Sequence, residues 1–268
     1  MAEKDYLAIA KKKGTRASKM KSFRRIMVYG RNKKGKSRLG VSPGIENVLV
    51  IDPEQGVSSM KALDPFVWPI SRWEDIQEVY GALRTGKLTP NHLSQGESST
   101  PFSWVSVDGL TRLNNMALNY VRRSAEDRDL DRQPGMIQQR DYGKSGELMC
   151  QLLVQFHTLP LNVYYTAQER MLTTGGSFDD DDDADDAEVY LVPDLPNKVR
   201  GMVNSLAEVI GRIYVVQIER KGVQVSERRL QIGINNRYDT GYRSDFVLPE
   251  VIRKPTLPKL VQMMEEGA

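Results

Sequence analysis

The sequence predicts an α/β fold with a mostly parallel central sheet, helices on both of its faces and an antiparallel edge. Two observations support this prediction. Short apolar runs rich in β-branched and aromatic residues alternate with segments of helical periodicity, the order typical of parallel sheets. Later in the chain, residues 212–219 and 227–234 form two strand-like runs joined by a short connection, which is typical of an antiparallel pair.

The elements follow one another in a regular order. Strands are expected at residues 25–29, 47–52, 66–70, 104–108 and 161–167, because each run has the length and apolar character of a buried strand. Helices are expected at residues 73–86, 110–121, 148–156 and 197–211. Ser71 and Gly86 are suited to cap the first of these helices. Residues 89–101 and 122–135 are polar, and we expect loops there, the second of them mobile.

Composition predicts one core with two appendages. The chain has 268 residues, 40% of them hydrophobic, which is enough for one sizeable core. We expect a basic N-terminal arm at residues 1–22, a core at residues 23–248 and an extended, proline-punctuated tail at residues 249–268. Within the core, residues 171–188 are expected to form a loop that contains the acidic run SFDDDDDADDAE.

Several classes of protein are excluded by composition. The single cysteine, Cys150, forms no intrachain disulfide and fits a reducing compartment. Together with only His92 and His157, it is too little for a structural zinc site. No apolar run reaches the length of a membrane span, and the N-terminus lacks the apolar segment of a secretory signal. We therefore expect a cytoplasmic protein with no membrane contact.

The segment GRNKKGKS, residues 30–37, follows the first predicted strand and has the pattern of a P-loop. Glycines at its bends would let backbone N–H groups turn towards a phosphate. Lys36 would then reach the β- and γ-phosphates of a nucleotide, and the Ser37 hydroxyl would bind Mg²⁺. The alternative is a basic surface turn. The candidate nucleotide-binding residues are Gly30, Arg31, Asn32, Lys33, Lys34, Gly35, Lys36, Ser37 and Arg38.

Three further polar residues follow predicted strands. Asp108 ends its strand and is suited to hold Mg²⁺ through water, although a strand-end aspartate is also a common turn residue. Glu54 lies just beyond Asp52, where a carboxylate could activate the water that attacks a γ-phosphate. The alternative there is a simple turn made by Asp52 and Pro53. Gln168 is suited to sense the γ-phosphate; read alone, it is a surface glutamine.

Taken together, these segments resemble the RecA-type ATPase core. More closely, they resemble the phage-encoded RecA-like nucleotide-binding proteins that include the Sak group of single-strand annealing proteins. The resemblance covers residues 25–255 and implies a RecA-like P-loop NTPase that uses ATP and Mg²⁺. It also implies that Glu54 is the catalytic base, Asp108 the Walker B aspartate and Gln168 the sensor. The matching segments, in order, are GRNKKGKS, IDPEQG, SRWEDIQEVYGAL, VSVDGLTRL and YYTAQER.

The resemblance further implies that the loop at residues 171–188 occupies the place of a DNA-binding loop. Its seven aspartates depart from that pattern, because affinity for a phosphate backbone comes from lysine and arginine. Three explanations remain open. DNA contact has moved to the N-terminal arm and to residues 122–140, or the acidic run gates access to DNA, or it meets a basic partner.

RecA-type ATPases often complete their site with a cation from the next subunit. The resemblance therefore implies a homo-oligomer with ATP at the subunit interfaces. Arg243 is the first candidate for this cation and Arg237 the second. The alternative is that Arg243 is simply solvated near the C-terminus.

The leading hypothesis for function is a Mg²⁺-dependent ATPase that acts on single-stranded DNA in phage recombination or strand annealing, in the cytoplasm of the host bacterium. The second is a slowly hydrolysing loader or switch that binds a single-strand-binding or replication protein. A third is a small-molecule phosphotransferase, and a fourth is a DNA-binding scaffold that ATP merely stabilises. The phosphotransferase would need a lid of arginines, for which the candidates are Arg122, Arg123, Arg128, Arg132 and Arg140.

Overall fold

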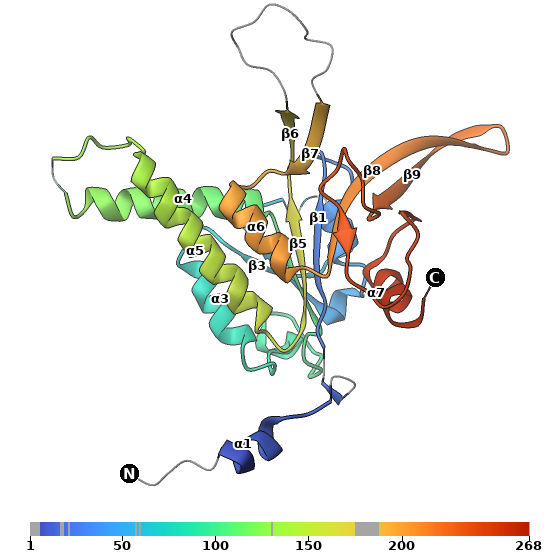
Figure 1. Cartoon of the computed structure of the whole chain (residues 1–268), viewed down its shortest axis with the longest axis horizontal. Coiled ribbons are helices and arrows are strands. Elements are labelled where there is room, and N and C mark those ends of the chain that lie inside the picture. The colour runs from blue at the N-terminus through green and yellow to red at the C-terminus, as the bar shows by residue number, and fades with distance from the viewer. Residues whose placement is uncertain are drawn as a thin grey trace, which may run out of the picture.

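The computed structural model describes residues 6–16, 19–20, 22–56, 58, 60–129, 131–174 and 188–267. Within these residues the centre of the molecule is a nine-stranded sheet in the order β11-β9-β8-β1-β5-β4-β2-β3, with β10 paired to β8 (Figure 1). The pairs among β1, β2, β3, β4, β5 and β8 are parallel, whereas β9, β10 and β11 join by antiparallel pairing. The predicted α/β class and its antiparallel edge are confirmed.

The strands lie close to their predicted positions. The central sheet contains β1 (Arg25–Tyr29), β2 (Val48–Asp52), β3 (Phe66–Pro69), β4 (Trp104–Asp108), β5 (Asn162–Ala167), β8 (Val209–Arg220), β9 (Val223–Gln231), β10 (Gly241–Tyr242) and β11 (Val251–Arg253). A separate hairpin consists of β6 (Glu169–Thr174) and β7 (Glu188–Pro193). It occupies the two ends of the segment that we expected to be a loop. The acidic run between its strands, at residues 177–187, lies outside the described residues.

Helices cover both faces of the sheet. The described helices are α1 (Tyr6–Lys13), α2 (Lys36–Gly40), α3 (Asp75–Leu83), α4 (Leu110–Glu126), α5 (Gln139–His157), α6 (Asn197–Leu206) and α7 (Leu257–Glu266), with short 3-10 turns at Ile45–Asn47 and Pro90–His92. All of these α-helices except α1 contribute to the core beside the sheet. Alternate residues of β1 point to opposite faces: Met27 and Tyr29 pack with α3 to α6, and Ile26 and Val28 with α2 and α7. Burial on both faces explains why the parallel strands are continuous apolar runs.

The C-terminal segment differs from the expected extended tail. β11 pairs with β9, and α7 buries Leu257, Leu260 and Met264 in the core on the α2 face. Thr256 caps α7 by accepting a hydrogen bond from the backbone N–H of Lys259 at 3.2 Å. Pro258 lies in the first turn of this helix, where the missing N–H has no partner to lose. The prolines therefore begin a helix here, and the expectation of an extended tail is wrong.

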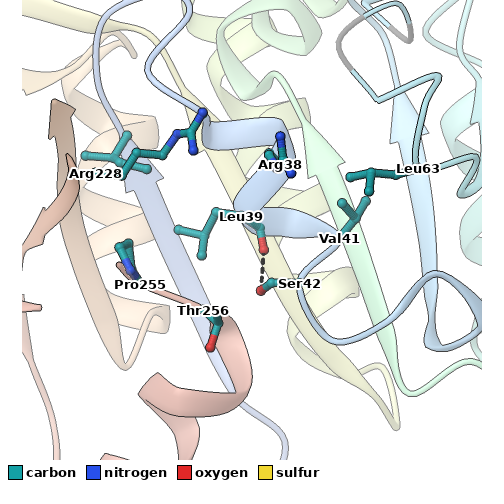
Figure 2. Close-up of a pocket in the computed structure, with 10 residues that line it drawn as sticks. Arg38, Leu39, Val41, Ser42, Leu63, Arg228, Pro255 and Thr256 are labelled. Atoms are coloured by element: carbon teal, nitrogen blue, oxygen red, sulfur yellow. Dashed lines mark hydrogen bonds between the residues drawn. The ribbon is translucent and has the colours of Figure 1, made fainter. Parts of the chain in front are cut away.

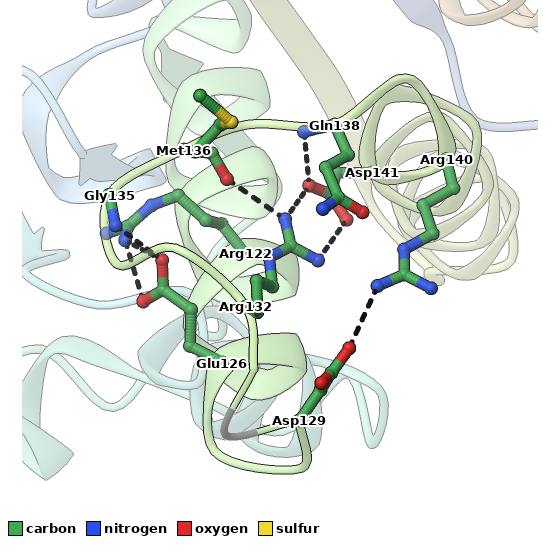
Figure 3. Close-up of polar contacts among 9 residues, drawn as sticks. All are labelled: Arg122, Glu126, Asp129, Arg132, Gly135, Met136, Gln138, Arg140 and Asp141. Atoms are coloured by element: carbon green, nitrogen blue, oxygen red, sulfur yellow. Dashed lines mark hydrogen bonds and ion pairs between the residues drawn. The ribbon is translucent and has the colours of Figure 1, made fainter.

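The segment expected to be mobile, residues 122–135, is held by several contacts (Figure 3). α4 continues through its first residues to Glu126, whose carboxylate accepts a hydrogen bond from the backbone N–H of Gly135 at 2.7 Å. Further along, Arg132 forms an ion pair with Asp141 in which the two side chains are only 0% and 1% exposed. The pairing partner comes from α5, nine residues away, so composition alone does not reveal it.

Among the described helices, none combines the length and the apolar character that a membrane span requires. Figure 1 shows α1 away from the sheet, at the end opposite to the β6–β7 hairpin.

Candidate active site

The carboxyl ends of four neighbouring parallel strands, β1, β5, β4 and β2, meet at one edge of the sheet. The side chains predicted to act together follow these ends: Lys36 after β1, Gln168 after β5, Asp108 at the end of β4 and Glu54 after β2. They line one cavity of about 320 Å³. The structure thus brings together residues that lie up to 132 positions apart in the chain.

The P-loop has the backbone conformation that its glycines allow. Gly35 has a φ of +96°, in the left-handed region that favours glycine. A Cβ on Gly30 would lie 2.5 Å from the carbonyl oxygen of Ile213 on β8, so the close approach of these two backbones also requires glycine. Between them, Lys33 has a φ of +62°, which completes a tight turn into α2. This geometry suits a loop whose N–H groups bind phosphate.

Lys36 is buried, and its ammonium group closes the loop from inside. It donates hydrogen bonds to the carbonyl oxygens of Gly30 at 2.8 Å and Arg31 at 3.1 Å, and to Oε1 of Gln168 at 3.4 Å. Burial lowers the pKa of Lys36, and the nearby carboxylates of Glu54 and Asp108 oppose this shift. The ammonium group is therefore positioned to exchange one of these acceptors for a phosphate oxygen.

Asp108 and Ser37 lie next to each other on the floor of the cavity. Asp108 accepts hydrogen bonds from the hydroxyl of Thr166 at 2.9 Å and from the hydroxyl of Ser37. Burial raises the pKa of Asp108, and these two hydrogen bonds oppose the shift. A hydroxyl beside a carboxylate is a donor set that fits Mg²⁺ bound mainly by phosphates and water. In the described part of the chain, no three histidine, cysteine or acidic side chains gather into a metal site of their own.

Glu54 is held in the cavity by its backbone and by a glycine. Asp52 accepts hydrogen bonds from the backbone N–H groups of Glu54 at 3.1 Å and Gly56 at 3.2 Å, so Asp52 does form the turn considered as the alternative. That turn presents the Glu54 side chain to Gln168, whose amide donates to Oε1 at 3.5 Å. A Cβ on Gly109 would lie 2.7 Å from Cγ of Glu54, so this glycine, which sequence reasoning missed, makes room for it.

The electrostatics of Glu54 predict how hydrolysis depends on pH. Burial and the charge of Asp108 raise the pKa of Glu54, and Gln168 and Lys36 oppose the shift. A general base acts when ionised, so turnover should fall as the pH falls through this raised pKa. We expect the acidic limb of the kcat profile, measured with saturating Mg²⁺-ATP, to begin at a higher pH than an ordinary glutamate would give. A Glu54→Gln enzyme should lack that limb; a limb retained by the variant would assign it to another group.

The other predicted nucleotide-binding residues are distributed around the loop. Asn32, Lys33 and Arg38 line the cavity, and Lys34 is half-buried beside them. Arg31 is exposed and forms an ion pair with the buried carboxylate of Glu169 at 3.4 Å. Glu169 also holds Arg212 of β8 at 2.5 Å. Because Glu169 directly follows Gln168 and begins β6, it connects the P-loop with the base of the β6–β7 hairpin.

The two arginines predicted to act between subunits lie elsewhere. Arg243 follows β10, which pairs with the start of β8, so it lies at the opposite end of the sheet from the P-loop. Its guanidinium donates to the carbonyl oxygens of Ser205 at 3.0 Å and Asn204 at 3.3 Å, at the end of α6. Its place in its own subunit is therefore structural, and its action on a neighbouring subunit stays a prediction. Arg237 is exposed beside β7, and its trans role likewise stays a prediction.

The arginines considered as a lid or as DNA contacts are mostly engaged within their own segment. Arg122 binds Glu126 at 2.6 Å, and Arg140 lies 3.6 Å from Asp129. Arg132 is buried against Asp141 (Figure 3). These pairs leave Arg123 and Arg128 as the two of the five for which the described residues include no ion-pair partner. Three of the five arginines that a phosphotransferase lid would need are therefore already paired with acidic side chains, which argues against the phosphotransferase hypothesis.

A second hollow adjoins the first and was not predicted (Figure 2). It has a volume of about 260 Å³ and shares Gly35, Arg38 and Arg228 with the first cavity. The rest of its lining consists of two hydroxyl residues, Ser42 and Thr256, and of apolar side chains from several elements: Leu39, Val41, Leu63, Ile213 and Pro255. Arg228 comes from β9, at the antiparallel edge of the sheet. No local pattern marked it, because its position beside the P-loop depends on how β9 packs over α2.

Comparison with known families agrees with this geometry. The family described as the AAA domain matches residues 22–244, which is most of the chain and includes all four strands that carry the site. A search of curated proteins finds no match.

Proposed function

Since the chain belongs to the AAA domain family and is an ATPase-type protein with a P-loop, we propose that it hydrolyses Mg²⁺-ATP to control its hold on single-stranded DNA. The observation that carries this proposal is the position of Gln168. Its side chain contacts both Lys36 and Glu54, and the next residue begins the β6–β7 hairpin. A γ-phosphate bound between Lys36 and Glu54 would change these contacts of Gln168. Because the hairpin begins at the next residue, the change would also alter the position of the hairpin.

The residues divide the chemistry among themselves. The P-loop N–H groups and Lys36 would bind the phosphates, Ser37 and Asp108 would hold Mg²⁺ with water, and Glu54 would orient and deprotonate the attacking water. A Mg²⁺ ion held by Ser37 and Asp108 would supply positive charge beside the phosphates. Glu169 extends the arrangement by connecting Arg31 of the P-loop to Arg212, whose guanidinium lies 4.7 Å from the ring centroid of Tyr238.

The proposed DNA contact is the basic N-terminal arm, in which Lys11, Lys12 and Lys13 form the last turn of α1. The resemblance to phage-encoded annealing proteins supports a role in recombination or strand annealing. α1 lies away from the P-loop end of its own sheet (Figure 1), so DNA bound there would run along neighbouring subunits of a homo-oligomer. Arg243 and Arg237 stay candidates for cations supplied across such an interface.

A second function has one specific observation in its favour. The β6–β7 hairpin stands where a DNA-binding loop is expected, yet its two strands flank the seven aspartates of residues 177–187. An acidic segment repels DNA and fits a basic protein surface. In this alternative the chain is a nucleotide-dependent loader or switch, and its slow hydrolysis responds to a replication protein.

Steady-state ATP hydrolysis with and without single-stranded DNA tests the proposal. We expect DNA to stimulate turnover several-fold, and Lys36→Ala to abolish it because the phosphates lose their buried cation. Lys61→Ala, at an exposed lysine outside the cavity, is the matched control and should hydrolyse ATP normally. If the rate of ATP hydrolysis is the same with and without DNA, the loader or switch hypothesis is favoured. A Lys36→Ala enzyme with a normal rate would refute the assignment of this cavity as the nucleotide site.

A further inference from the structure

Arg228 is an arginine packed against the P-loop from outside it. A Cβ on Gly35 would lie 2.9 Å from Cδ of Arg228 and 3.4 Å from its Cζ, so the guanidinium group lies directly over this glycine. Gly35 therefore meets two demands: a left-handed backbone and space for the Arg228 side chain. The side chain reaches this position because Arg228 shares a face of β9 with Leu230, which packs in the core beside α2.

The guanidinium of Arg228 also lacks the acceptors that its neighbours have. Arg229 and Arg220 both hold the buried carboxylate of Glu227, at 3.0 Å each, and Arg212 holds Glu169. For Arg228, by contrast, the described residues include neither an ion pair nor a side-chain hydrogen bond. Its side chain is exposed to the cavity that also contains Lys36 and Ser37. A guanidinium with free donors beside a phosphate-binding loop is suited to bind an anion there.

The position of Arg228 between the two hollows indicates which part of the nucleotide it meets. The γ-phosphate belongs near Glu54 and Gln168, which line the first cavity but not the second hollow. The second hollow, which combines apolar side chains such as Leu39 and Pro255 with the hydroxyl residues Ser42 and Thr256, suits the nucleoside. The two hollows meet at Gly35, Arg38 and Arg228, so the α- and β-phosphates would pass beneath the guanidinium.

We propose that Arg228 binds the α- and β-phosphates of the nucleotide held by its own chain, as a cation supplied in cis from the β8–β9 hairpin. This inference rests on the proposed function. A planar guanidinium can donate two parallel hydrogen bonds to phosphate oxygens, which a lysine cannot. Because β8 and β9 extend past the end of β1 as a projecting hairpin, bound nucleotide would also restrain the position of that hairpin.

Binding measurements with two probes test the proposal: a fluorescent ATP analogue, and inorganic tripolyphosphate as its competitor. Hydrogen bonds to charged groups predict that Arg228→Ala weakens both by roughly tenfold to a hundredfold. Arg228→Lys should recover only part of the loss. Arg220→Ala, which removes the same charge from the same hairpin outside the cavity, should bind both probes normally. Unchanged affinity, or loss for the ATP analogue with normal tripolyphosphate binding, would overturn the assignment to the phosphates.

Mixing two variants tests whether the arginine acts in cis. If Arg228 served a neighbouring subunit, Lys36→Ala subunits would supply it to the intact P-loops of Arg228→Ala subunits, and mixing would restore ATP hydrolysis. We expect no restoration, and restored turnover would overturn the cis assignment. Lys36→Ala also separates the two proposals. If it binds both probes normally, the nucleotide site itself is wrong, whereas loss in Lys36→Ala with normal binding in Arg228→Ala refutes only the present inference.

Discussion

Glu54→Gln is expected to lower the kcat of ATP hydrolysis by roughly 10²–10⁴-fold and to leave ATP binding nearly intact. The substituted glutamine would keep the size of the side chain and its contact with Gln168, but it has no basic carboxylate to take a proton from water. Nucleotide affinity depends on the P-loop, Lys36 and Mg²⁺, which the substitution leaves in place. Single-turnover hydrolysis, measured together with equilibrium ATP binding, distinguishes lost chemistry from lost affinity.

The matched control is Glu46→Gln, the same chemical change just before β2, at the opposite end of that strand from Glu54. Glu46 is exposed and outside the cavity, so its variant should hydrolyse ATP at the wild-type rate. If Glu54→Gln stays within about threefold of the wild type, another group activates the water, and the role assigned to Glu54 is wrong. A wild-type protein that binds ATP tightly without turnover would instead favour the scaffold hypothesis.

Arg25→Met is expected to lower the free energy of unfolding by about 3 kcal/mol, a much larger loss than the same substitution at the neighbouring Arg24. Arg25 is only 3% exposed, at the start of β1. Its guanidinium donates to the carbonyl oxygens of His157 at 2.6 Å, Leu159 at 2.8 Å and Leu161 at 2.9 Å. Methionine fills the space but leaves these carbonyls without their donor, at a place where α5 turns into β5. The measurement is urea-induced unfolding, in which the midpoint should fall while the slope stays constant.

Its neighbour provides the control. Arg24 pairs with Glu265 at 3.2 Å, but the two side chains are 19% and 53% exposed, so Arg24→Met should cost less than about 1 kcal/mol. Equal losses in the two variants would show that the buried carbonyls find other donors and that Arg25 contributes no more than a surface arginine. Neither residue lines the active-site cavity, so the folded fraction of each variant should hydrolyse ATP normally.

Much of the candidate active site could be predicted from local sequence, because its residues lie at strand ends with characteristic neighbours. The P-loop is encoded within eight residues, Gly30 to Ser37. Asp108, Glu54 and Gln168 each lie at or just after the end of an apolar run. The carboxyl ends of neighbouring parallel strands share one edge, and the structure places these strands side by side in the order β1-β5-β4-β2, so the side chains that follow them line one cavity.

Other features depend on contacts between distant segments. Arg228 reaches the P-loop only because β9 folds back along β8 and packs beside α2. Its sequence neighbours Glu227 and Arg229 form an ion pair with each other instead. Gly109 matters through the side chain of Glu54, which lies far earlier in the chain. The charged segment at residues 122–135 was expected to be mobile for a related reason: the buried pairing of Arg132 with Asp141 is invisible to composition.

The C-terminal segment and the candidate trans cation illustrate the same division. The prolines of the C-terminal segment predicted an extended tail. A helix, α7, forms there because its apolar face packs against the side of the sheet that α2 also covers, and this surface exists only once the strands have assembled. Arg243 was assigned from its place in the chain, and the fold puts its guanidinium on the last carbonyls of α6. Sequence by itself determined the fold class and the position of the P-loop, and it predicted the carboxylates that line the same cavity, since these depend on short-range patterns at strand ends. Tertiary structure alone decided which arginines are free to meet a nucleotide, because that depends on which acceptors the folded chain brings within hydrogen-bonding distance.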